Sequence, residues 1–246
     1  MRESYTKEID RERVTVEIEL DATRHKKEYP WLFSVFIKFS RAAQSSERYE
    51  EFLETKEALI IALEYDGNVI YVGSREIEGW SEIYFHAKEP KELEVTASKI
   101  VSAGMFAYEC SAMRDAKWNF YEVSLYPSEL ELHNIQSAHI IELLVEEGDD
   151  IAIAREVEHY VSFDTQSQLE RFKNRAAELG FVYKDDIESE DLEHGMALVK
   201  VHTLLESDVA QNVKTLYEAL QKDHGHYEGW STVLACEDSA CEDDAE

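Results

Sequence analysis

Six carboxylates lie close together in one short stretch of the C-terminal half of the chain. They are Asp185, Asp186, Glu188, Glu190, Asp191 and Glu193, all within the acidic segment 185–193. Carboxylates packed this densely need full solvation or a facing cation. Their chemistry is therefore electrostatic, and such a segment can hold the Lys and Arg side chains of a protein partner. A solvated acidic loop without a partner is the alternative interpretation.

A second candidate group stands near the end of the chain, in Tyr227-Glu228-Gly229-Trp230. Tyrosine and tryptophan are common at the centres of protein interfaces, but the same side chains also fill cores. For Trp230 both interpretations stand, whereas for Trp118 core packing is favoured. The sequence has no Lys or Arg after Lys222, and its acidic tail, 236–246, is predicted to be disordered.

Residue patterns that support catalysis or metal binding are absent from the sequence. It contains no glycine-rich phosphate loop, no H-E-x-x-H zinc motif and no G-x-S-x-G nucleophile. His224 and His226 lie two residues apart without a nearby Cys or patterned Asp, so they are interpreted as surface residues. His159 falls on the apolar face of a predicted strand, where a hydrogen-bonded core residue is favoured over a ligand or base. We therefore predict no catalytic residue, no metal and no cofactor.

The charge of the whole chain favours a protein partner. Of 246 residues, 53 are acidic and 25 basic, which gives a formal net charge of −28. Nucleic acids and anionic membranes are bound through Lys and Arg, so this chain would be repelled by them. A basic protein surface is the natural electrostatic partner, although such a charge also favours solubility.

The location of the protein follows from its cysteines and its apolar runs. Three cysteines occur without a C-x-x-C pair, the N-terminus lacks an apolar signal segment, and no apolar run approaches about 20 residues. We predict a cytoplasmic protein.

The elements of the C-terminal region follow one another in a regular order. Apolar alternation predicts strands at 155–163, 181–186, 196–204 and 227–234. One helix is predicted from a cap at Thr165 to Leu179, and a second from a cap at Ser207 to Gly225. The order is βαββαβ, the ferredoxin-like arrangement, with both helices on one face of an antiparallel sheet. The stretch 187–195 is predicted to be an acidic loop between the two middle strands.

The N-terminal region is predicted to form a second domain of the α+β class. Strands are expected at 13–20, 31–39, 69–72, 81–86, 106–112 and 119–125, and helices at 47–63 and 91–103. Ser128 and Glu131 fit a capping box for a helix that reaches about Glu147, with a break near Gln136-Ser137. We place the domains at 1–148 and 149–235, followed by the acidic tail.

A short sequence echo links the two regions. Ile77-Glu78-Gly79-Trp80-Ser81 resembles Tyr227-Glu228-Gly229-Trp230-Ser231, and a predicted strand accompanies each. The echo leads to the hypothesis that the N-terminal domain is antiparallel α+β of related, duplicated architecture.

Several motifs of the C-terminal region occur in the order known from one protein family. They are Arg155-Glu156-Val157-Glu158-His159-Tyr160, the cap at Thr165, the Gly180-Phe181 turn, the acidic segment, and Tyr227-Glu228-Gly229-Trp230. Over about residues 150–246 the chain resembles the regulator of ribonuclease E activity B, with Glu228 where the family motif has Asp. The resemblance implies a ferredoxin-like fold, no catalytic residues, and inhibition of ribonuclease E by direct protein binding.

The N-terminal region resembles an uncharacterised bacterial domain that is fused in front of such modules. The matching pieces are Tyr71-Val72-Gly73-Ser74-Arg75, Gly79-Trp80 and Trp118-Asn119-Phe120-Tyr121. This resemblance implies no activity.

Three classes of function follow. The first is a non-enzymatic regulator whose acidic segment, with Tyr227, Glu228 and Trp230, binds a basic region of a protein such as ribonuclease E. The second is an enzyme or small-ligand-binding protein with a site in the N-terminal domain, around Arg75, Glu76 and Glu78. The third is an assembly domain without a ligand, in which sheet edges pair to form a homodimer.

Overall fold

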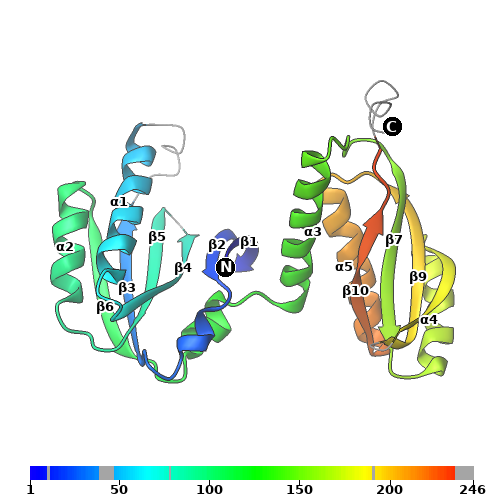
Figure 1. The fold of residues 1–246 in the computed structure, drawn as a ribbon, viewed down its shortest axis with the longest axis horizontal. Helices are drawn as coiled ribbons and strands as arrows, with labels where there is room; N and C mark the ends of the chain where they lie inside the picture. Colours follow the sequence, from blue (N-terminus) through cyan, green and yellow to red (C-terminus); the bar gives the residue numbers. More distant parts are fainter. Residues whose placement is uncertain (10–11, 39–46, 78, 190–191, 236–246) are drawn as a thin grey trace, which may run out of the picture. The chain divides into compact units, whose positions relative to one another are not determined.

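A computed structural model describes residues 1–9, 12–38, 47–77, 79–189 and 192–235 (Figure 1). It divides into two compact units, Met1–Pro127 and Ser128–Glu246. Helix α3 (Glu129–Glu146) belongs to the second unit, whereas the boundary drawn from the sequence at 148 assigns this helix to the first. The acidic tail lies outside the described residues.

The first unit is built on a six-stranded antiparallel sheet with the order β1-β2-β4-β5-β3-β6. Helices α1 (Glu47–Glu64) and α2 (Leu93–Ala103) pack against one face, around Phe33, Phe52 and Phe85. The strands are β1 Arg2–Ile9, β2 Glu12–Glu19, β3 Trp31–Lys38, β4 Val69–Ile77, β5 Trp80–Ala87 and β6 Tyr108–Arg114, and the 3-10 helix η1 Ala22–His25 follows β2. Strand β1 was not expected, because half of its residues are charged.

The segment after β6 corrects the prediction of a strand at 119–125. These residues are helical and include the π-helix η3 (Tyr121–Leu125). The Asp115 carboxylate accepts the backbone N–H groups of Asn119 and Phe120, at 2.9 and 3.0 Å, and so caps the turn. Trp118 lies fully buried, stacked on His86 with ring centroids 3.9 Å apart. The predicted core packing of Trp118 is confirmed.

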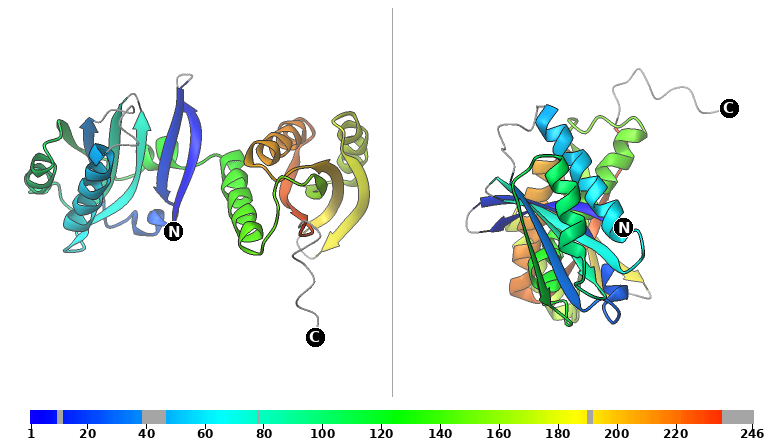
Figure 2. Two further views of the ribbon diagram at one scale, coloured as in Figure 1. Left: turned by 90° about the horizontal axis from the view of Figure 1, so that it is seen from above. Right: turned by 90° about the vertical axis from the view of Figure 1, so that its left-hand side faces the viewer.

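The second unit has the predicted βαββαβ order. It consists of β7 Arg155–Phe163, α4 Gln166–Glu178, β8 Val182–Ser189, β9 Leu192–His202, α5 Glu206–Asp223 and β10 Gly225–Thr232. The sheet order is β10-β7-β9-β8 and every pairing is antiparallel, which is the ferredoxin-like sheet. Helices α4 and α5 lie on one face of this sheet (Figure 2), around Val157, Phe172 and Val213.

Helix α3 begins at the predicted capping box, in which Ser128 and Glu131 each accept the other's backbone N–H. It runs without a break past Gln136-Ser137 and packs against α5 and β10.

Two local predictions in the second unit are wrong. Residues 187–189 and 192–195 of the predicted acidic loop lie in strands, because β8 continues to Ser189 and β9 starts at Leu192; residues 190 and 191 lie outside the described residues. The sequence did not predict a strand there because the acidic segment is rich in charged side chains. Exposed strands nevertheless tolerate charge. Ser207 is not the cap of α5, which begins at Glu206. Thr203 serves this turn instead: its hydroxyl accepts the N–H of Leu205 and donates to Asp208.

The same topology recurs in the first unit. Its elements from β3 to β6 also run βαββαβ, and the sheet order β4-β5-β3-β6 corresponds to β8-β9-β7-β10. The related architecture predicted for the N-terminal domain is thus confirmed, with β1 and β2 added at one edge. The sequence echo does not mark equivalent positions, because Trp80 opens the third strand of its repeat and Trp230 lies in the fourth.

Candidate functional site

The sheet of the second unit has one face that α4 and α5 do not cover, called the open face below. On β7 the side chains of Val157 and Val161 belong to the core under these helices, so Glu156, Glu158 and Tyr160 point the other way. Strand pairing extends the open face to its neighbours. Its described residues are Glu156, Glu158, Tyr160, Ser162, Val182, Lys184, Asp185, Ile187, Ala197, Val199, Val201, His226, Glu228 and Ser231.

A β-bulge sorts the residues of the Tyr-Glu-Gly-Trp motif between the two faces. The register of β10 against β7 shifts between Tyr227 and Gly229, and Gly229 has φ 133°, a conformation that L side chains rarely adopt. The extra residue lets Tyr227 and Trp230 both point into the core, where they are 4% and 5% exposed. Glu228 is exposed on the open face, where it accepts a hydrogen bond from Ser162. The Trp230 indole donates to the Ser137 hydroxyl of α3 at 2.9 Å.

The two neighbouring acids Asp185 and Asp186 also separate. Asp185 pairs with Ala197 across the sheet and lies on the open face. Asp186 turns to the helix face, where its carboxylate lies 3.2 Å from the ammonium group of Lys173 on α4. The side chains of Glu188, Glu190, Asp191 and Glu193 lie outside the described part of the chain. Of the candidates from the sequence, the structure therefore places Asp185 and Glu228 on one face, on β8 and β10.

The open face joins carboxylates to exposed aliphatic surface. Its described acids are Glu156, Glu158, Asp185 and Glu228, and its one described Lys or Arg, Lys184, forms an ion pair with Glu158. Val182 and Val201 are 68% and 62% exposed. Sequence reasoning missed Glu156 and Glu158 as site residues, although their alternation with Val157 and His159 already placed them on the outer face of a strand.

A chain of hydrogen bonds lies under the sheet, on its helix side. His202 Nδ1 donates to the carbonyl of Thr203 at 2.7 Å, so its Nε2 accepts from His159 Nε2 at 3.2 Å. His159 Nδ1 then accepts from the Tyr227 hydroxyl at 2.8 Å. Burial lowers the pKa of His159 to about 3 and also lowers the pKa of His202. Neutral rings fit these hydrogen bonds, because each ring offers one N–H donor and one acceptor nitrogen. The interpretation of His159 as a hydrogen-bonded core residue is confirmed.

The N-terminal candidates do not converge on one site. Arg75 forms an ion pair with Glu82, and its guanidinium lies over the rings of Tyr84 and Phe120 at 5.7 and 5.6 Å. Glu76 follows Arg75 along the strand and points to the opposite face of the sheet. Glu78 lies outside the described residues.

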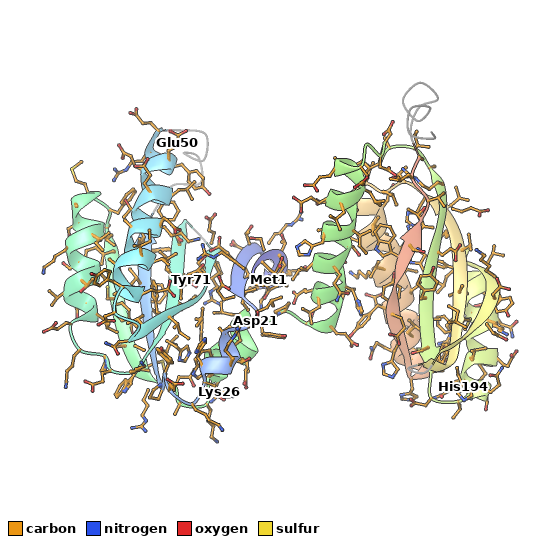
Figure 3. All side chains as sticks on the ribbon, in the orientation of Figure 1. Met1, Asp21, Lys26, Glu50, Tyr71 and His194 are labelled. Carbon is orange, nitrogen blue, oxygen red and sulfur yellow. The ribbon has the colours of Figure 1, made fainter. Side chains whose placement is uncertain are left out.

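Tyr71, labelled in Figure 3, belongs to a polar network of the same unit. The Tyr71 hydroxyl donates to Glu17, and the Lys56 ammonium donates to Glu17 at 3.3 Å and to Ser74 at 2.9 Å. Burial raises the pKa of Tyr71. Burial also acts to raise the pKa of Glu17, but the charge of Lys56 and the hydrogen bond from Tyr71 outweigh it, so the pKa of Glu17 is lowered. These groups satisfy one another, which is typical of a structural network.

The described residues lack two further features. They contain no group of three or more His, Cys, Asp or Glu side chains arranged to hold a metal ion. None of their helices combines the length and apolar character that a membrane span requires.

Comparisons with known proteins give similar solved structures and two family models. Solved structures with similarity include an unknown protein from Galdieria sulphuraria, at 13% identity, with 84% of this chain and 100% of that chain covered and a TM-score of 0.22. A protein from Bacteroides thetaiotaomicron covers 82% of this chain and 94% of its own at 10% identity, with a TM-score of 0.20. The fold follows from the chain's own two sheets. No curated protein matches the chain.

Two family models match, one in each unit. Residues 3–126 match a family of unknown function (DUF695), and residues 134–232 match the regulator of ribonuclease activity B. The chain therefore belongs to this family of unknown function through its N-terminal half, and its C-terminal region matches the family model of the regulator of ribonuclease activity B.

Proposed function

We propose that this chain regulates a ribonuclease by binding a basic segment of that enzyme on the open face of its C-terminal sheet. The observation that carries the proposal is the make-up of that face, with Glu156, Glu158, Asp185 and Glu228 around exposed valines and Lys184 already paired. Such a face attracts Lys and Arg head groups, while their aliphatic stems lie on Val182 and Val201.

The charge of the molecule supports a protein partner over RNA. With a formal net charge of −28, the chain repels phosphate backbones, whereas a ribonuclease needs basic segments to hold its RNA. Binding on the open face would occupy such a segment and so reduce RNA binding by the enzyme. No catalytic step by this chain is required. Ribonuclease E, a cytoplasmic partner implied by the family resemblance, is the enzyme to test first.

The test compares two charge-reversal variants of the full chain that carry the same net charge. Glu156→Lys with Glu228→Lys alters the open face, and Glu178→Lys with Glu218→Lys alters exposed positions on α4 and α5. Calorimetric titration into ribonuclease E should show at least a tenfold loss of affinity for the first variant. The second variant should lose less than threefold, because it alters only the long-range attraction, which changes equally in both variants, and leaves the open face intact.

Salt and activity provide two independent readouts. Affinity of the wild type should fall as NaCl rises from 50 to 300 mM, since exposed charge pairs are screened. Inhibition of RNA cleavage should weaken in parallel with affinity across the variants. Absence of binding at low salt, or equal losses for the two variants, would contradict the proposal.

A further inference from the structure

Among the described residues, strand β6 forms a sheet edge of the first unit that has no register shift and fewer charged residues than β1. Exposed strand edges invite pairing with another chain, and proteins blunt them with bulges, charges or covering elements. Strand β8 has two register shifts, β10 has a bulge between Tyr227 and Gly229 and packs against α3, and β1 carries four charged residues in eight. Strand β6 has a regular register, and among the described residues it pairs with β3 alone.

The hydrogen-bond pattern shows which groups of β6 are open. Lys38 N–H donates to the carbonyl of Ala107, and Asp115 N–H donates to that of Pro30, so odd-numbered residues face β3. In an antiparallel ladder the alternate residues point their N–H and C=O groups the other way. The backbone groups of Tyr108, Cys110, Ala112 and Arg114 therefore point outward from the sheet edge.

A second copy of β6 satisfies all of these groups in one register. When two β6 strands run antiparallel about a twofold axis at Ser111, Cys110 pairs with Ala112 of the other copy and Tyr108 pairs with Arg114. Each of these is a hydrogen-bonded pair, so every outward N–H and C=O between Tyr108 and Arg114 finds a partner. The axis is perpendicular to the sheet, and the helices of both copies stay on one face.

Side chains and charge favour the second copy over another partner. In this register Glu109 lies opposite Met113, and Arg114 lies opposite Tyr108, so no like charges face each other. Met113 is 56% exposed in the single chain and would be covered. The strand carries one acid and one base, within a chain of net charge −28, and is thus a neutral stretch on which two acidic molecules can meet.

We propose that the chain forms a homodimer in which the β6 edges pair about Ser111 and join the two six-stranded sheets. Light scattering after size exclusion should give twice the 28.5 kDa of one chain at about 50 μM. Ala112→Pro removes an outward N–H that the ladder with β3 does not use, and this variant should fold and elute as a monomer.

A matched pair of lysine substitutions tests the register. Ser111→Lys places two cations opposite each other at the axis, and dimer affinity should fall at least tenfold. Met113→Lys adds the same charge on the same face, two residues away, but meets Glu109 of the other copy, so the dimer should persist. Both positions are exposed in the single chain, so neither variant threatens its fold.

Cysteine cross-linking gives a second, geometric test in a chain with Cys110, Cys236 and Cys241 changed to Ser. Ser111→Cys should form an intermolecular disulfide on mild oxidation, because Cα atoms of a non-hydrogen-bonded pair lie about 4.5 Å apart. Met113→Cys should not, since the two copies of residue 113 lie about 13 Å apart. A monomeric wild type, equal behaviour of the two lysine variants, or a dimer that survives Ala112→Pro would each overturn the proposal.

Discussion

At the scale of single residues, the second unit is organised around a base that the fold keeps uncharged. His159 is fully buried, and its two ring nitrogens are bonded to Tyr227 and His202 in a chain that has no place for an additional proton. Tyr227 belongs to the sequence motif that pointed to binding, yet its hydroxyl serves this chain. The tyrosine of the motif is thus a structural residue, while Glu228 beside it is exposed.

Acid should destabilise the protein through His159. The unfolded chain binds a proton at this residue below about pH 6.5, whereas the folded protein binds one only near pH 3. The stabilisation is therefore complete above pH 6.5 and is lost as the pH falls. Between pH 7 and 5 the wild type should lose about 2 kcal/mol of unfolding free energy more than His159→Gln. Urea denaturation at the two pH values measures this, with the exposed His226→Gln as control. Equal losses for wild type and His159→Gln would refute the assignment.

At the scale of elements, periodicity predicted most of the fold and failed where one capping residue decides the structure. The alternation of β2, β3 and β7 was readable because one face of each is buried. Segment 119–125 reads as a strand for its aromatic and branched residues, but Asp115 accepts two backbone N–H groups and turns it into a helix. Asp115, four residues before Asn119, was the feature of the sequence that could have predicted this helix. The sequence located only part of the open face, because which strands flank β7 depends on long-range pairing.

Removing this cap should loosen the segment it starts. Asp115→Ala leaves the N–H groups of Asn119 and Phe120 without their partner and should cost about 1–2 kcal/mol of unfolding free energy. Trp118 loses its fixed position on His86, so its fluorescence should shift to longer wavelength. Asp115→Asn, which keeps one acceptor oxygen, should recover part of the loss. Unchanged stability and emission in Asp115→Ala would contradict this role.

At the scale of the whole molecule, two units share one topology, and the first adds two strands while the second adds α3. The second unit has its own core, to which Ile141 of α3 contributes and against which Leu130, Ile140 and Leu144 of the same helix pack. Helix α3 therefore belongs to the core of the second unit, although it lies outside the βαββαβ pattern that the sequence predicts. Sequence patterns placed the boundary after this helix because the Gly148-Asp149-Asp150 turn is the stronger local signal.

Two fragments should distinguish these boundaries. A fragment of residues 128–235 should unfold cooperatively, whereas one of residues 149–235 exposes the core side that α3 covers and should be less stable by at least about 3 kcal/mol. Trp230 is the only tryptophan of either fragment, and loss of its bond to Ser137 should red-shift its emission in the shorter one. Equal stability and equal emission of the two fragments would show that α3 is dispensable.

The bulge at Glu228 and Gly229 has a consequence for how this domain can diverge. In a regular strand, consecutive residues of the motif would alternate between the core and the surface. A change in their spacing would then disturb both the core and the surface. Here the extra residue seats Tyr227 and Trp230 inside and leaves position 228 outside, bonded only at its tip. The side chain at position 228, where we propose that a partner binds, can therefore be exchanged while the core stays as it is. If the proposed function holds, related chains can change their partner by substitution at this position while keeping the same fold.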